Sequence, residues 1–100
     1  MLAGLKQKDF AEHVNSVFTI TAQSGERAEV LLMEVTGKED AHTEQFSLMF
    51  KGPTQNVLEQ DTHTVSHAKL GTFEMFLGPV FTGKTDAVYY QAIFNRIKTQ

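Results

Sequence analysis

One segment of the sequence has the spacing of a phosphate-binding loop, Gly78-Pro-Val-Phe-Thr-Gly-Lys-Thr85. Such a loop binds phosphate when it follows a parallel strand and opens a helix, because the helix amides and dipole hold the anion. The residues after Thr85 alternate like a strand, and Pro79-Val-Phe81 is bulky where the backbone would approach a phosphate. The segment therefore predicts a turn between two strands, with nucleotide binding as the remote alternative.

The four histidines, His13, His42, His63 and His67, are the residues most suited to bind a metal ion. On a helix, His63 and His67 would be one turn apart and could share an ion. In the strand predicted for them they lie on one face about 13 Å apart, which is too far for one ion. A zinc site made of His42, one strand histidine and a carboxylate is the alternative to structural histidines. We expect no metal and no other cofactor.

The sequence offers little for covalent catalysis. It has no cysteine, which excludes thiol catalysis, thiolate metal sites and disulfides. No serine is flanked as in the glycine-x-serine-x-glycine turn of hydrolases. The paired carboxylates Glu39 and Asp40 lie in a polar segment, where solvent is their expected partner. We expect no catalytic residues, so the chain is not predicted to be an enzyme.

Composition and charge narrow the class of protein further. The formal net charge of -3 disfavours nucleic acid as a partner, because proteins that bind it neutralise several phosphates with a basic face. The segment Met1–Asp9 lacks the apolar stretch of a secretory signal, and no window approaches the ~20 apolar residues that span a bilayer. We expect synthesis in the cytoplasm and no insertion into a membrane.

The elements that must position these residues are mostly strands. The segment from Leu70 to Val80 is the densest apolar run and predicts the central strand. Its alternate residues form one apolar face and one mixed face. The apolar face carries Phe73, Met75 and Leu77, and the mixed face carries Thr72, Glu74 and Phe76.

Period-two alternation predicts the other strands as well. They are expected over about 16–22, 27–36, 44–50, 61–68 and 87–97, with Gly25 turning the first hairpin and a polar loop over 37–43. Val57 and Leu58 are expected to anchor a single turn between two strands. A short helix over Lys8–Asn15 is expected to place Phe10 and Val14 against the sheet.

These elements predict a single, mainly β domain over residues 1–100. Sequential strands joined by tight turns favour an antiparallel meander of about six strands that closes into a barrel or a two-layer roll. The short N-terminal helix is expected to plug an open end. The order of the strands is left undetermined.

Some strands carry more large apolar residues than one buried face requires. Leu31, Met33 and Val35 give their strand a second apolar face, and Phe76 and Tyr89 lie on the second faces of later strands. Such residues are either core in a closed barrel or contacts with another protein. We take these five residues as the candidate interface.

Several short stretches resemble those of a family of small bacterial proteins classified as a domain of unknown function. The stretches are Asp9-Phe10, Val17-Phe18, Phe46-Ser-Leu-Met-Phe-Lys-Gly-Pro53, His67, Leu70-Gly71, Phe73-Glu74, Phe76-Leu77, Pro79-Val80 and Tyr90-Gln-Ala-Ile-Phe-Asn95. His67 matches a histidine of the family pattern, whereas His63 stands where the pattern has an aromatic residue. Members of this family tend to be encoded beside proteins like those of phage tail collars. The resemblance implies an accessory or structural part of a phage-tail-like or surface-fibre assembly, which could leave the cell with a larger particle.

Two hypotheses about function follow, from different classes. The first is a non-enzymatic structural or interaction module that contacts another protein or a second copy of itself. The alternative is a small barrel that binds a hydrophobic ligand among its aromatic side chains. A metal-dependent or nucleotide-dependent enzyme is the remote third hypothesis.

Overall fold

The computed structural model describes residues 7–39, 42–55 and 57–97. These residues form one short helix and six antiparallel strands. The elements are α1 (Gln7–Ala11), β1 (Val17–Thr21), β2 (Arg27–Glu39), β3 (Thr43–Gly52), β4 (Asp61–His67), β5 (Gly71–Val80) and β6 (Val88–Ile97). The predicted mainly β fold with one short N-terminal helix is confirmed. No helix among the described residues is long and apolar enough to cross a bilayer.

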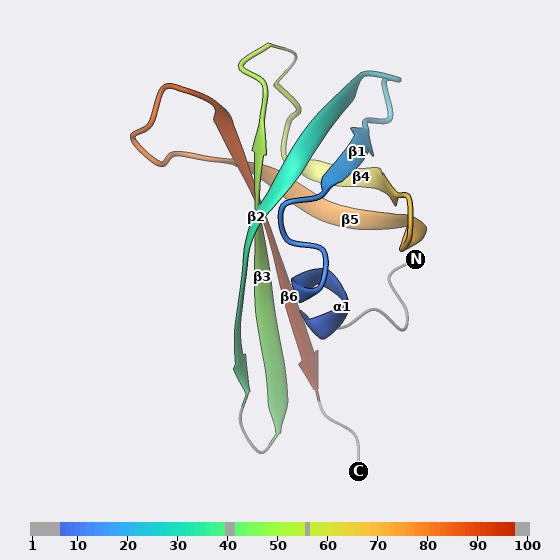
Figure 1. Ribbon diagram of the computed structural model, residues 1–100, viewed down its shortest axis with the longest axis vertical. Coiled ribbons are helices and arrows are strands. Elements are labelled where there is room, and N and C mark those ends of the chain that lie inside the picture. Colours follow the sequence, from blue (N-terminus) through green and yellow to red (C-terminus); the bar gives the residue numbers. More distant parts are fainter. Residues whose placement is uncertain (1–6, 40–41, 56, 98–100) are drawn as a thin grey trace.

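The strands close into a barrel in the order β1-β2-β3-β6-β5-β4. In Figure 1, β2, β3 and β6 run side by side along the long axis, and β4 and β5 cross them. The chain therefore does not pass round the barrel strictly in sequence order, because β3 lies beside β6 and β4 lies beside β1. The connection from β3 to β4 has to cross one end of the barrel.

That connection is fastened to the barrel by Leu58. Its side chain is buried, and its backbone N–H donates a hydrogen bond of 3.0 Å to the hydroxyl of Tyr90 in β6. Val57 beside it is exposed, so only one of the two residues predicted to anchor this segment does so. The contact gives a buried tyrosine hydroxyl its partner, which a buried polar group requires.

The barrel closes through a short contact between β5 and β6. These strands share only three register pairs, which join Gly78–Val80 to Tyr89–Gln91. Elsewhere β5 pairs with β4, and β6 pairs with β3. A Cβ on Gly78 would lie 2.5 Å from the Cβ of Gln60, so only glycine fits where the chain passes from one neighbour to the other.

Phe10 of α1 is fully buried in the core among aromatic rings of the strands. Its ring centroid lies 6.4 Å from that of Phe18, 6.0 Å from Phe46 and Phe73, and 6.2 Å from Phe94. These rings come from four strands, and Phe73 and Phe94 belong to the two strands that share the short contact. The helix thus packs its apolar residue into the barrel as predicted, and Val14 packs against the same core.

The fully buried core consists of the inward residues of all six strands, together with Phe10 and Leu58. Its members are Phe10, Phe18, Ile20, Ala28, Val30, Leu32, Phe46, Leu48, Phe50, Leu58, Val65, Phe73, Met75, Leu77, Tyr90 and Ala92. The predicted apolar faces of the strands therefore point inward. Side chains occupy the interior.

Two predicted boundaries are wrong. The helix ends at Ala11 rather than Asn15, because residues 12–15 turn the chain into β1, and Asn15 adopts a left-handed φ of 74° that a helix does not allow. The segment predicted as a polar loop over 37–43 is mostly strand, since β2 extends to Glu39 and β3 begins at Thr43. Pairing between β2 and β3 satisfies the backbone of these polar residues, and this pairing outweighs their low strand propensity.

Candidate functional site

The segment with phosphate-binding spacing joins two antiparallel strands. Gly78–Val80 ends β5, and the chain then loops to β6, which begins at Val88. Lys84 places its amine 5.6 Å from the ring centroid of Tyr89, and its backbone N–H donates to the hydroxyl of Thr82 at 3.2 Å. Over the described residues up to 97, the element that follows the glycines is β6 and not a helix that could hold a phosphate. The turn predicted for this segment is what the structure contains.

His13, Ser16 and His67 form a polar cluster where the turn after α1 meets the β4–β5 hairpin. The hydroxyl of Ser16 lies 2.9 Å from Nε2 of His67 and donates a bond of 2.5 Å to the carbonyl of His13. The two imidazole rings have centroids 4.6 Å apart, and the ring of Phe18 lies 4.4 Å from His67. A serine beside a histidine suggests a nucleophile and its base. Whether His67 can act as that base depends on its tautomer, because the nitrogen facing Ser16 must carry a lone pair.

The other nitrogen of His67 settles the tautomer. Nδ1 accepts hydrogen bonds from the backbone N–H groups of Lys69, at 3.0 Å, and Leu70, at 3.2 Å. A nitrogen that accepts carries no proton in the neutral ring, so the hydrogen is on Nε2 and is donated to Ser16. A general base would need the opposite tautomer, with a free lone pair aimed at the serine. This histidine therefore holds the hairpin turn and does not activate Ser16.

The environment of His67 also favours its neutral form. Burial lowers the pKa of His67 below its ordinary value of 6.5, and the neighbouring His13 and Lys69 lower it further. Protonation at Nδ1 would also break both bonds from the turn. The charge state of this residue is therefore coupled to the folded hairpin.

The two histidines of β4 make separate contacts. His63 is buried, and its Nε2 lies 2.6 Å from the carbonyl oxygen of Glu59. His63 and His67 point to the same face of β4, as their spacing predicted. Among the described residues, no three histidine, aspartate or glutamate side chains come together as metal ligands.

A bulge in β2 separates the three residues predicted to share one outer face. The register shifts between Leu32 and Glu34, so that Leu32 pairs with Phe50 while Val35 pairs with Leu48. Met33 is the extra residue, and beyond it the inward and outward positions exchange. Val35 therefore packs against the core and does not share an outer face with Leu31 and Met33, so for this residue the core alternative is the one the structure shows.

Tyr89 is also placed differently from the prediction. It pairs with Lys51 on the outer face of the β2–β3–β6 sheet, yet it is only 7% exposed, and the amine of Lys84 lies over its ring. Phe76 is exposed as expected, on the outer face of β5 opposite Thr62. Leu31 is half-buried on the outer face of β2, in register with the exposed Val17.

A pocket of about 350 Å³ forms around Met33 on the outer face of the long sheet. It is lined by Met33, Glu34, Met49, Thr82, Lys84 and Tyr89, and we call it the methionine pocket. It brings together two of the five predicted interface residues, Met33 and Tyr89. Leu31 lines a different, shallower surface with Val17 and Lys51, where Lys51 forms an ion pair of 3.4 Å with Asp86.

Sequence reasoning missed the most exposed aromatic residue. Phe81 follows β5 directly, next to Thr82 at the edge of the methionine pocket, and it is 98% exposed. In the apparent phosphate-binding motif the lysine is the functional residue, and Phe81 occupies a position to which the motif gives no role. A large apolar residue between a proline and a glycine in a turn was the available signal.

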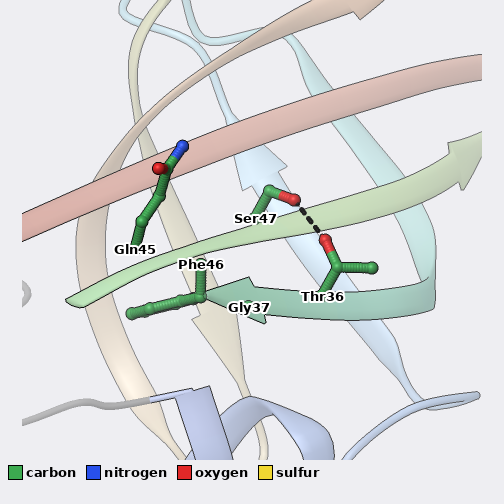
Figure 2. A pocket seen from close by; sticks show the side chains of 5 residues that line it. All are labelled: Thr36, Gly37, Gln45, Phe46 and Ser47. Atoms are coloured by element: carbon green, nitrogen blue, oxygen red, sulfur yellow. Dashed lines mark hydrogen bonds between the residues drawn. The ribbon is translucent and has the colours of Figure 1, made fainter. Parts of the chain in front are cut away.

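A smaller pocket of about 170 Å³ lies further along the same two strands. Figure 2 shows Thr36 of β2 and Ser47 of β3 pointing toward one another, joined by a hydrogen bond of 2.6 Å between their hydroxyls. Gly37 closes its inner side, where a Cβ would clash with the side chain of Gln7 in α1. One of these hydroxyls donates to the other, so each has a hydrogen-bond partner in the pocket.

The fold and these surfaces define a small closed antiparallel barrel with a filled core and an apolar pocket on its outside. The chain belongs to the family described as a domain of unknown function, DUF6916, whose model matches residues 5–94. No curated protein matches the chain, and no solved structure does.

Proposed function

We propose that this chain is a non-enzymatic interaction module that associates with protein through the methionine pocket. The observation that supports the proposal is the pairing of an apolar pocket of about 350 Å³ with a neighbouring Phe81 that is 98% exposed. An apolar ring in water is unfavourable, and burial against a partner removes that cost. Methionine and phenylalanine are among the residues that protein interfaces favour.

The partner that fits this surface best is a second copy of the chain. Phe81 directly precedes Thr82 of the pocket lining, and the proposed dimer has a two-fold axis through which each copy inserts its Phe81 into the pocket of the other. The lining also contains one acidic and one basic residue, Glu34 and Lys84. In the proposed dimer, Glu34 of one copy lies opposite Lys84 of the other, and this complementarity favours self-association.

A setting for this module comes from the resemblance to small bacterial proteins encoded near phage-tail-collar-like proteins. We extend the proposal to an accessory component of a phage-tail-like or surface-fibre assembly, in which the barrel is one repeated part. Joining copies through an outer face suits this role, because such assemblies are built from many copies of small subunits. Final incorporation into an exported particle is part of the same proposal.

Light scattering across a concentration series tests the association. We expect an oligomer for the unchanged chain, and a shift toward the monomer for Met33→Asp, Met49→Asp and Phe81→Asp. A buried carboxylate without a partner is unfavourable, so association should weaken at least tenfold. Circular dichroism and thermal unfolding of each variant show whether the monomer still folds.

Phe76→Asp is the matched control, because Phe76 is an exposed phenylalanine on a different face of the barrel. We expect this variant to associate like the unchanged chain. An unchanged chain that stays monomeric at all concentrations would contradict self-association. Loss of the oligomer in Phe76→Asp, with none in Met33→Asp, would move the interface to β5.

A further inference from the structure

A second pocket, of about 320 Å³, lies where the β1–β2 turn meets the β3–β4 connection and β4. Its lining includes both carboxylates and apolar residues, together with Gln23, Ser24 and His63. Three carboxylates stand at its exposed positions, Glu26, Glu59 and Asp61. Three apolar residues form much of the remaining wall, Ala22, Val57 and Leu58. We call this the acidic pocket.

His63 adds a buried hydrogen-bond acceptor to the acidic pocket. The residue lines the pocket and is only 3% exposed. Its Nε2 lies 2.6 Å from the carbonyl of Glu59, and a carbonyl can only accept, so Nε2 carries the hydrogen. In the neutral ring the lone pair is then on Nδ1. That atom is buried and has no hydrogen-bond partner among the described residues.

A buried acceptor without a partner is unfavourable, and a ligand with an N–H group would satisfy it. The surrounding carboxylates favour a positive charge on that ligand. A metal ion fits less well, since no three acidic or histidine side chains among the described residues converge as ligands. The apolar wall of Ala22, Val57 and Leu58 suits an alkyl chain.

We propose that the acidic pocket binds a primary ammonium group carried on a short aliphatic chain, with an N–H donating to Nδ1 of His63. Two sources present this chemistry, a free aliphatic diamine and the side chain of a lysine. The carboxylates hold the charge, and the alkyl chain lies along Val57 and Leu58. This site lies apart from the methionine pocket and is independent of the proposed association.

The probe is butane-1,4-diamine, titrated at neutral pH and constant ionic strength while nitrogen–proton correlation spectra follow the His63 ring. We expect a saturable change at His63 Nδ1, since a new donor alters the shielding of that nitrogen. Butan-1-ol has a similar chain without the charge and should bind at least tenfold more weakly. An unchanged Nδ1 signal, or equal binding of the alcohol, would overturn the proposal.

Rim variants test the charge without touching the core. Glu59→Gln and Asp61→Asn should each weaken diamine binding roughly two- to fivefold, the range of exposed ion pairs. Glu74→Gln, an exposed carboxylate on the outer face of β5, is the matched control and should leave binding unchanged. Equal weakening by Glu74→Gln would assign the effect to net charge and reject the site.

A second probe, Nα-acetyl-lysine methylamide, separates the two sources. Tighter binding of this probe than of the diamine supports a lysine of a protein partner as the occupant. Tighter binding of the diamine supports a free amine. The proposal fails if neither changes the Nδ1 signal.

Discussion

At the scale of single residues, His67 shows how one side chain serves the fold through both of its nitrogens. Nδ1 accepts two backbone N–H groups of the β4–β5 turn, and Nε2 donates to Ser16 beside β1. The imidazole therefore links the hairpin to the segment between α1 and β1. Because Nε2 donates its hydrogen to Ser16, it has no lone pair with which to take a proton from the serine hydroxyl, and Ser16 is not activated as a nucleophile.

The lowered pKa of His67 predicts a loss of stability in mild acid. Burial, His13 and Lys69 all depress the folded-state pKa below 6.5, so the unfolded chain binds the proton more readily. The stabilising contribution is complete above pH 6.5 and is lost as the pH falls from there through the lowered pKa. Urea unfolding across this range should show the decline.

His67→Asn supplies the control for that experiment. The asparagine oxygen can accept from the turn in place of Nδ1, and it does not titrate. The stability difference between the unchanged chain and this variant should shift in favour of the variant as the pH falls. A difference that stays constant from pH 8 to 5 would contradict the coupling of His67 to the hairpin.

At the scale of elements, the bulge at Met33 determines what β2 buries. Before it, Val30 and Leu32 face inward, and after it Val35 faces inward. If Met33 were an ordinary strand residue instead of a bulge, strict alternation would place Glu34 inward and Val35 outward. The bulge also leaves Met33 38% exposed, at the pocket on which the proposed association depends.

Deletion of Met33 should be tolerated by the barrel. Removing the bulged residue restores plain alternation, with Leu32 and Val35 still inward, so we expect the free energy of unfolding to fall by less than about 2 kcal/mol. Deletion of Ser47 in the unbulged partner strand β3 is the comparison. It shifts one side of that strand to the wrong face and should cost much more, as chemical denaturation would show. Equal losses in the two deletions would contradict this account of the bulge.

At the scale of the whole molecule, the barrel depends on a residue outside its strands. β5 and β6 meet over three register pairs, and Phe10 contacts the rings of Phe73 and Phe94, which lie on these two strands outside the paired stretch. The helix is too short to be stable alone, so packing of Phe10 is what holds it in place. The filled centre also gives little support to a hydrophobic ligand inside the barrel.

Phe10→Ala should destabilise the barrel by about 3 to 5 kcal/mol, the usual range for truncating a buried phenylalanine. Phe76→Ala removes the same ring from an exposed position and should change stability by less than about 0.5 kcal/mol. Urea unfolding of both variants measures the difference. A small effect of Phe10→Ala would mean that the strands close the barrel without α1.

Much of the fold follows from the sequence alone, because alternation along a strand is a local property. Period two identified the inward faces of β3 and β5, and the glycine at position 25 marked the first hairpin, where its φ is 95°. Residue types alone also excluded thiol chemistry, because there is no cysteine, and disfavoured nucleic acid as a partner, because the formal net charge is -3. These features depend only on residue type and near neighbours.

Only the tertiary structure decided the faces and partners of the candidate site residues. Val35 turned inward because pairing with β3 placed a bulge at Met33, and the amine of Lys84, from the loop before β6, lies over the ring of Tyr89. His63 acquired its buried, unpaired nitrogen because the β3–β4 connection brought the Glu59 carbonyl to its ring. Each outcome depends on residues brought together by the strand order, and alternation along one strand carries no information about that order.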